Sequence, residues 1–268
     1  MQIQANGITL NCTIDRKPDA PWVMFAHGIA NDMSIWADVA ARLGSWFNIL
    51  RFDARGHGGS ESVGGDYTFK MLTRDAVALM DAMKIPRAHY VGISLGGMVG
   101  LGLALDHPDR LLSLACCDAR ASTTPDYRKA WVGRRAVVLE EGMEPIVEQS
   151  MARWFAPGFR QRQPGRAAQV QAMIRRTSPN GYRGCAAALL ALDYFRHLGR
   201  IATPTLYLVG EHDQGAPPAT MRGMQAATPA AQYVEIREAG HLSCIEQPAA
   251  VADALANFFS DRALVANP

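Results

Sequence analysis

The hexapeptide Gly92-Ile93-Ser94-Leu95-Gly96-Gly97 decides how the rest of this sequence is interpreted. It follows an apolar run at residues 89–93, which is expected to form a strand, and it opens a helical pattern. In this context the motif G-x-S-x-G places a serine on a sharp turn between strand and helix. Only glycine fits at positions 92 and 96, because larger side chains would clash with the adjacent strand and helix. The motif therefore predicts that Ser94 is a nucleophile at a helix N-terminus, where the helix dipole favours developing negative charge. A purely structural glycine-rich turn is the alternative.

Short apolar runs alternate with longer helical patterns on both sides of this motif. Strands are expected at residues 22–26, 48–52, 89–93, 111–117 and 205–209, and a further strand-like run covers 232–236. An N-terminal hairpin is expected around the turn dipeptide Asn6-Gly7, and amphipathic helices are expected at 69–83 and 247–259. This alternation predicts an α/β fold with a mostly parallel central sheet and helices on both faces.

Residues 119–200 interrupt the alternation. This segment lacks strand-like runs and consists of helical patterns separated by proline and glycine. From Arg120 to Arg200 it holds 14 Lys and Arg against 6 Asp and Glu, so the net charge of +2 for all 268 residues hides a basic middle. We interpret residues 119–200 as a helical cap inserted into one catalytic core, which consists of residues 1–118 and 201–268.

The composition argues against several classes of protein. Hydrophobic residues make up 49% of the chain and charged residues 19%, which suits a buried core and not a disordered chain. The near-neutral total charge argues against a nucleic-acid partner. The N-terminus lacks the basic and apolar regions of a secretory signal, and the longest uncharged stretch considered, at 90–105, is shorter than the roughly 20 residues of a spanning helix. We therefore expect no membrane association.

The cysteine pattern argues against a disulfide framework or a zinc site. The five cysteines form an odd, unclustered set without a C-x-x-C motif. A reducing cytoplasmic compartment fits this pattern. No metal or organic cofactor is implied, and the sequence leaves open whether the protein is a monomer or a homo-oligomer.

A serine nucleophile needs a base, and the base needs an acid that orients it. His241 follows the strand-like run at 232–236 and precedes the last helix, so it is expected at the same sheet edge as Ser94. Asp213 follows another strand and lies between Ser94 and His241 in the chain, which is the order required of a triad on such a sheet. Asp118, at the end of the preceding strand, is the competing acid. Otherwise it is expected to line the pocket or to cap a helix.

Two backbone N–H groups are expected to form an oxyanion hole. One belongs to Leu95, which follows the nucleophile, and the other to Ile29, in the sharp turn after the strand at 22–26. His27 lies in the same turn and is expected to fix the loop geometry. Asn31 is a candidate for substrate contact, although ordinary turn chemistry explains it equally well. The tight loop at 53–60 is expected to have a structural role.

Taken together, these residues resemble the α/β-hydrolase superfamily over essentially the whole chain, and within it the 3-oxoadipate enol-lactonases. The motifs that carry the resemblance are the stretch at 94–100, Arg153-Trp154-Phe155, Gly181-Tyr182, the stretch at 239–243 and Ile245-Glu246-Gln247-Pro248. The resemblance implies an α/β-hydrolase fold, Ser94, Asp213 and His241 as the triad, and Trp154 as a pocket wall.

The sequence departs from the pattern of this family in two places. Residues 27–31 read His-Gly-Ile-Ala-Asn where the family commonly has Asn/His-Ser-Leu-Gly-Thr, and Cys117-Asp118-Ala119 stands where it often has Asn-Thr. Both departures fall at the expected pocket, so they bear on the identity of the substrate rather than on the chemistry.

The sequence therefore favours hydrolysis of a small ester or enol-lactone through an acyl-enzyme on Ser94. The basic middle segment favours an anionic substrate such as 3-oxoadipate enol-lactone, because a cap over the triad can focus a carboxylate into the site. Arg134 and Arg153, together with Arg175 and Arg176, are candidates for a carboxylate clamp, with a solvated helix face as the alternative for each. A general carboxylesterase or arylesterase, a C–C bond hydrolase of aromatic degradation and a non-catalytic hydrolase-fold binding protein remain open.

Overall fold

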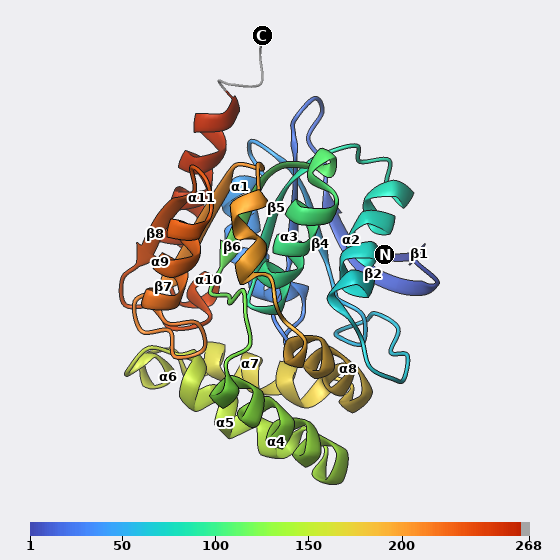
Figure 1. Ribbon diagram of the computed structural model, residues 1–268, viewed down its shortest axis with the longest axis vertical. Helices are drawn as coiled ribbons and strands as arrows, with labels where there is room; N and C mark the ends of the chain where they lie inside the picture. The colour runs from blue at the N-terminus through green and yellow to red at the C-terminus, as the bar shows by residue number, and fades with distance from the viewer. Residues whose placement is uncertain (264–268) are drawn as a thin grey trace.

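The computed structural model describes residues 1–263 and builds this part of the chain around an eight-stranded sheet (Figure 1). The strand order is β1-β2-β4-β3-β5-β6-β7-β8. Neighbouring strands are parallel from β4 to β8, whereas β2 pairs antiparallel with both β1 and β4. The strands are β1 (Gln2–Ala5), β2 (Ile8–Asp15), β3 (Trp22–Ala26), β4 (Asn48–Phe52), β5 (Ala88–Ile93), β6 (Leu111–Cys117), β7 (Thr205–Gly210) and β8 (Gln232–Ile236).

The N-terminal hairpin and the central strands confirm the expected elements. β1 and β2 are joined at Asn6 and Gly7, whose φ angles of 48° and 76° suit a tight hairpin turn. β5 lies between β3 and β6 and is buried along its whole length, because a central parallel strand is covered on both faces. The mostly parallel sheet covered by helices is the architecture that the alternating sequence pattern predicts.

Helices pack on the sheet in two groups. On one side α1 (Ala37–Leu43) packs against α11 (Pro248–Ala263), and on the other α2 (Phe69–Ala82) packs against α3 (Leu95–Asp106). α9 (Pro218–Ala227) contacts β7 and β8, and the short α10 (Ser243–Glu246) precedes α11. The predicted helix at 69–83 matches α2 within one residue, and the Thr68 side chain caps its start by accepting a hydrogen bond from the Met71 N–H. No helix within residues 1–263 is both long and apolar enough to span a lipid bilayer.

Five α-helices occupy the chain between β6 and β7 and gather at one end of the molecule (Figure 1). We call them the α4–α8 layer: α4 (Pro125–Glu141), α5 (Glu144–Trp154), α6 (Phe159–Arg162), α7 (Pro164–Arg176) and α8 (Pro179–Leu190). Proline in the first turn of α4, α7 and α8 suits these helix starts, because the missing N–H would have no partner there. The chain enters and leaves the layer side by side, where a β-bridge pairs Ser122 with Asp193.

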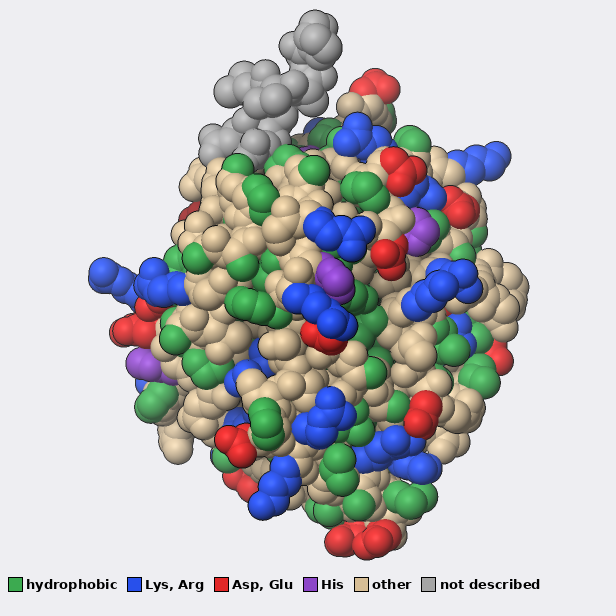
Figure 2. All heavy atoms as spheres, in the orientation of Figure 1, with side chains coloured by type: hydrophobic (Ala, Val, Ile, Leu, Met, Phe, Trp, Pro, Cys, Tyr) green, Lys and Arg blue, Asp and Glu red, His purple; other side chains and the backbone are tan. Residues whose placement is uncertain are grey.

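Several arginines of the α4–α8 layer form ion pairs at the surface. Arg160 pairs with Glu148, and Arg175 pairs with Glu144. Basic and acidic side chains are interspersed on the face shown in Figure 2. The positive excess of the middle segment therefore does not form one continuous basic surface on this face.

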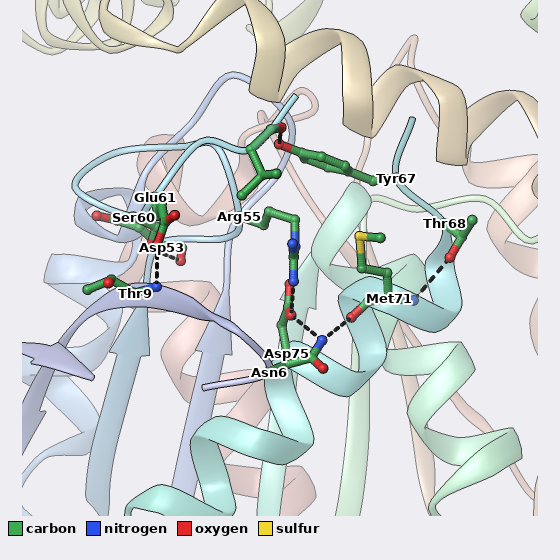
Figure 3. Close-up of polar contacts among 11 residues, drawn as sticks. Asn6, Thr9, Asp53, Arg55, Ser60, Glu61, Tyr67, Thr68, Met71 and Asp75 are labelled. Carbon is green, nitrogen blue, oxygen red and sulfur yellow. Dashed lines mark hydrogen bonds and ion pairs between the residues drawn. The ribbon is translucent and has the colours of Figure 1, made fainter. Parts of the chain in front are cut away.

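The loop at 53–60 follows the carboxyl end of β4 and is held by hydrogen bonds and an ion pair (Figure 3). The Asp53 carboxylate accepts hydrogen bonds from the Met33 and Gly59 N–H groups, at 2.7 and 2.8 Å. Arg55 forms a buried ion pair with Asp75 of α2, with a shortest N···O distance of 2.6 Å. These contacts agree with the structural role expected for the loop.

Candidate active site

Ser94 lies at the tip of the sharp turn between β5 and α3. Its φ and ψ of 54° and −117° are strained for a residue with a side chain, and such strain is concentrated at functional sites. A Cβ atom at Gly92 would lie 2.2 Å from the Gly96 carbonyl oxygen, and one at Gly96 would lie 2.5 Å from the Ala26 carbonyl oxygen. Both glycines are therefore required for steric reasons, as the motif indicated. The turn is further fixed by a 2.9 Å hydrogen bond from the Ser94 N–H to the Cys117 carbonyl.

His241 and Asp213 form a buried hydrogen-bonded pair. His241 Nδ1 lies 2.9 Å from each carboxylate oxygen of Asp213, whose side chain is inaccessible to solvent. The Asp213 Oδ1 also accepts hydrogen bonds from the Gly215 and Ala216 N–H groups, at 2.6 and 3.0 Å. These bonds hold the carboxylate in place, and the carboxylate favours the tautomer that carries its proton on Nδ1. His241 Nε2 is then available to accept a proton.

Ser94 and His241 line the same pocket. Among residues 1–263 no hydrogen bond joins the Ser94 hydroxyl to His241. In enzymes without substrate this contact is often long and shortens when the substrate binds. The arrangement brings together a serine, a histidine and a carboxylate from the ends of three different strands.

The loop at 27–31 runs directly beside the serine. A Cβ atom at Gly28 would lie 3.2 Å from the Ser94 Cβ. The Ala54 N–H donates to His27 Nε2 at 2.8 Å, so His27 carries its proton on Nδ1 and donates it to the Gly28 carbonyl at 2.7 Å. This bond fixes the peptide that connects Gly28 to Ile29, and Ile29 lines the pocket. His27 therefore fixes the loop geometry, as expected.

Leu95 is the first residue of α3, so its N–H has no partner within the helix. Leu95 follows Ser94 directly in the chain, and Ile29 lines the pocket together with Ser94, so the oxyanion hole formed by these two N–H groups stays a prediction.

Asp118 is fully buried beside the pair but is bonded elsewhere. Its carboxylate accepts hydrogen bonds from the Gly210 N–H at 2.8 Å and from the Ser243 hydroxyl at 2.6 Å. Burial, followed by the negative charge of Asp213, raises the pKa of Asp118 well above its ordinary value. Asp118 lines the pocket, which is one of its two expected roles besides that of the competing acid. Its two hydrogen bonds connect the end of β6 to β7 and to α10. It does not cap a helix through a backbone N–H.

The α4–α8 layer forms the wall opposite the serine. Trp154, Arg134 and Arg153 all line the pocket, and the Trp154 ring centre lies 6.4 Å from that of His241. The structure thus brings these three sequence candidates into the pocket that Ser94 and His241 line. It also adds lining residues for which we made no prediction, including Arg120, Tyr127, Trp131 and Tyr182.

Other sequence candidates lie outside this pocket. Asn31 is buried and lines a separate polar hollow together with Asp32 and Arg176. Arg176 pairs with Asp32, and Arg175 pairs with Glu144 on the surface. Because these arginines already have carboxylate partners away from the serine, they do not form part of a clamp at this site.

Arg120 could have been identified from its position in the sequence. It follows Asp118 at the end of β6, and side chains at the carboxyl ends of parallel strands meet at one sheet edge. Its Nε–H donates to the Gly215 carbonyl at 2.6 Å, next to Asp213, and its guanidinium lies 4.8 Å from the Tyr127 ring centre. Tyr127 and Trp131 carry no comparable signal, because helical aromatics more often pack in a core.

The residue types that commonly bind metal ions do not form a metal site in the described part of the chain. Within residues 1–263 no group of three or more His, Cys, Asp or Glu side chains is placed to hold a metal ion.

Comparison with known proteins agrees with this geometry. Residues 21–248 match the family model for the alpha/beta hydrolase fold. The chain is 31% identical over 250 residues to 3-oxoadipate enol-lactonase 2 of Acinetobacter baylyi, with 92% of each chain covered.

Two solved structures are similar over nearly the whole chain. The enol-lactonase from Burkholderia xenovorans LB400 has a TM-score of 0.93 at 35% identity and covers 97% of this chain and 100% of its own. A thermophilic esterase from Thermogutta terrifontis has a TM-score of 0.92 at 27% identity, with 98% of both chains covered. The fold, the relatives and the serine turn together identify this chain as an ester-hydrolysing enzyme that belongs to the α/β-hydrolase fold family.

Proposed function

We propose that the protein is a serine hydrolase that opens a small enol-lactone or ester bearing a carboxylate, with 3-oxoadipate enol-lactone as the leading candidate. The observation that carries the proposal is the hydrogen-bonded pair of His241 and Asp213, which faces the same pocket as Ser94 on its strained turn. The similarity to two enol-lactonases supports this choice of substrate class.

The reaction proceeds through an acyl-enzyme. His241 Nε2 takes the proton of the Ser94 hydroxyl as the oxygen attacks the substrate carbonyl. The N–H groups of Ile29 and Leu95 stabilise the oxyanion of the tetrahedral intermediate. The intermediate collapses, the carbonyl–oxygen bond of the ester breaks, and His241 returns the proton to the leaving oxygen. In a lactone this oxygen stays on the same molecule, so the opened chain remains bound to Ser94 until water attacks.

Water completes the cycle through the same groups. His241 removes a proton from the water, the resulting hydroxide attacks the acyl carbonyl, and the Ser94 oxygen leaves and is reprotonated. Asp213 stabilises the imidazolium that forms in each half of the reaction.

A carboxylate on the substrate is supported by the charges of the pocket. Arg120, Arg134 and Arg153 line it, and none of them forms an ion pair with an acidic side chain within residues 1–263. Arg134 lies 5.0 Å from the Trp131 ring centre, so a flat aromatic surface holds its guanidinium. Guanidinium groups bind carboxylates through paired charged hydrogen bonds, and Arg134 and Arg153 are the clamp that we propose.

We further propose that the α4–α8 layer is the inserted cap of one catalytic core, consisting of residues 1–118 and 201–268. The protein is assigned to the cytoplasm, because all five cysteines are buried free thiols. In this assignment it is a monomer or a homo-oligomer and takes part in the breakdown of aromatic compounds.

A general carboxylesterase is the second candidate, favoured by the structural similarity to the Thermogutta terrifontis esterase. The same triad serves both reactions, so the substrate decides between them. A panel containing the enol-lactone, its methyl ester at the carboxylate and a neutral aryl ester separates the two functions. We expect kcat/KM for the free carboxylate to exceed that of its methyl ester by about tenfold or more, because a charged hydrogen bond is lost. A higher kcat/KM for the neutral aryl ester would overturn the lactonase assignment and leave the serine mechanism intact.

A further inference from the structure

Glu246 is a buried carboxylate that joins the histidine loop to the α4–α8 layer. Its Oε1 accepts a hydrogen bond from the Gly240 N–H at 2.6 Å, and its Oε2 accepts one from the Ala156 N–H at 2.9 Å. Gly240 immediately precedes His241 in the chain. Ala156 lies in the turn after α5, two residues beyond the pocket wall at Trp154. One side chain at the end of α10 thus bonds to the backbone beside the base and to the backbone beside the pocket wall.

Two further contacts hold the same segments together. The Leu242 N–H donates to the Trp154 carbonyl at 3.2 Å, on the other side of His241. A Cβ atom at Gly240 would lie 2.7 Å from the Trp154 carbonyl oxygen and 2.9 Å from the Ala156 nitrogen. The backbone on both sides of His241 is therefore in direct contact with residues 154–156, so a displacement of one segment moves the other.

The Glu246 carboxylate lies in a buried environment that disfavours its negative charge. Burial raises the pKa of Glu246 from 4.5 to about 7, although its two N–H donors and the positive charge of Arg162 act in the opposite direction. The negative charge of Asp213 adds to the increase, and the buried carboxyl of Asp118 also lies close enough to interact with that of Glu246. A buried carboxylate of this kind is costly for stability, and buried carboxylates with a perturbed pKa beside a pocket are candidates for a role in the site.

We propose that Glu246 is a positioning residue, and that its carboxylate form clamps the α4–α8 layer to the histidine loop so that His241 faces Ser94. This inference rests on the proposed serine mechanism. The charged carboxylate offers an acceptor oxygen to each N–H, whereas the protonated form carries a hydrogen on one oxygen and loses most of that bond. Activity then requires two deprotonated groups, His241 as the base and Glu246 as the clamp.

The test is the pH profile of kcat/KM for a neutral aryl ester, which has no ionisable group of its own. When one protonation inactivates an enzyme, kcat/KM falls about tenfold per pH unit on the acid side, and two protonations give a steeper fall. We expect the steeper fall in the wild type. In Glu246→Gln the fall returns to about tenfold per unit, and kcat at the plateau is about tenfold lower, because the amide keeps only one acceptor.

Two other variants keep the test independent of folding defects. Glu211→Gln is the matched control, because Glu211 also accepts a backbone N–H, that of Glu238 at 3.0 Å, but does so on an exposed loop. It should reproduce the wild-type profile. Arg162→Gln removes an exposed cation near Glu246, together with its 3.3 Å hydrogen bond to the Pro157 carbonyl, and should shift the steep part of the profile to higher pH.

The possible outcomes separate this inference from the proposed function. If Glu246→Gln and Glu211→Gln both follow the wild-type profile while Ser94→Ala is inactive, the clamp is wrong and the serine mechanism stands. If Ser94→Ala keeps its activity, the proposed function itself fails. If Glu246→Gln does not fold, an unchanged profile in Arg162→Gln overturns the inference, and a shifted one supports it.

Discussion

The candidate active site has two parts that are built in different ways. We call the part that holds Ser94, Asp213 and His241 the floor, and the facing part of the α4–α8 layer the wall. On the floor, Ser94, Asp213 and His241 follow β5, β7 and β8, and each is fixed by backbone hydrogen bonds or by a glycine that no other residue can replace. On the wall, the α4–α8 layer offers Arg134 and Arg153 among aromatic side chains, with the Arg134 guanidinium held by ring contact rather than by a partner charge. From this difference we expect the fold to determine the chemistry and the packing of the layer to determine the choice of substrate.

The largest effect should come from the acid on the floor. Asp213→Asn is expected to lower kcat about 10⁴-fold, because an asparagine amide favours the wrong histidine tautomer. Asp118→Asn is the matched control, since that carboxyl is equally buried but bonds to the Gly210 N–H and the Ser243 hydroxyl. We expect its kcat to fall less than about tenfold, since it orients no proton acceptor. Equal losses in the two variants, measured by steady-state kinetics on the same ester, would show that the acid is misassigned.

A second contrast concerns ion pairs in the core and in the layer. Asp75→Ala leaves Arg55 buried without its partner, and we expect a loss of about 3–5 kcal/mol in the free energy of unfolding. Glu144→Ala removes the partner of the exposed Arg175 and should leave the unfolding curve unchanged within error. Urea denaturation of both variants tests the contrast, which fails if the layer variant loses as much stability as the core variant.

The pH dependence of stability provides a third contrast. Because folding raises the pKa of Glu246 from 4.5 to about 7, the folded state binds the proton more tightly than the unfolded state. This contribution is fully present below pH 4.5 and is lost as the pH rises through 7, with a total of about 3 kcal/mol. Relative to Glu246→Gln, which has no such proton, the wild type should lose stability between pH 5 and pH 8. Denaturation curves at both pH values check this, and a difference that is independent of pH would contradict it.

The smallest effect is expected on the wall. Arg134→Met and Arg153→Met should each raise KM for the carboxylated lactone about tenfold, through loss of a charged hydrogen bond, and should leave KM for a neutral ester unchanged. Arg160→Met is the control, because Arg160 pairs with Glu148 outside the pocket. A loss of kcat for both substrates would instead place these arginines in the chemistry of the floor.

Much of the floor could be predicted from the sequence because local constraints determine it. The strand pattern, the glycines around Ser94 and the order of Ser94, Asp213 and His241 depend on backbone geometry, which leaves a readable signal. The helices of the α4–α8 layer were also expected, because proline and glycine separate them.

The composition of the wall could not be predicted in the same way. Which arginines face the pocket depends on how α4, α5 and α7 pack, so Arg134 and Arg153 line it while Arg175 pairs with Glu144. One of the two hydrogen bonds of Glu246 comes from Ala156, which lies 90 residues away in the chain, and no local pattern indicates such a contact. Glu246 belongs to one of the motifs that carry the family resemblance, but that motif did not predict a role for it.

The most direct test of the serine mechanism is labelling with a fluorophosphonate probe, followed by mass spectrometry of the modified peptide. A serine activated by His241 and Asp213 should react with the probe, so the label should be found on Ser94 in the wild-type protein. Ser94→Ala should remain unlabelled, and Asp213→Asn should react far more slowly. Equal labelling of the wild type and Ser94→Ala would contradict the assignment of Ser94 as the nucleophile.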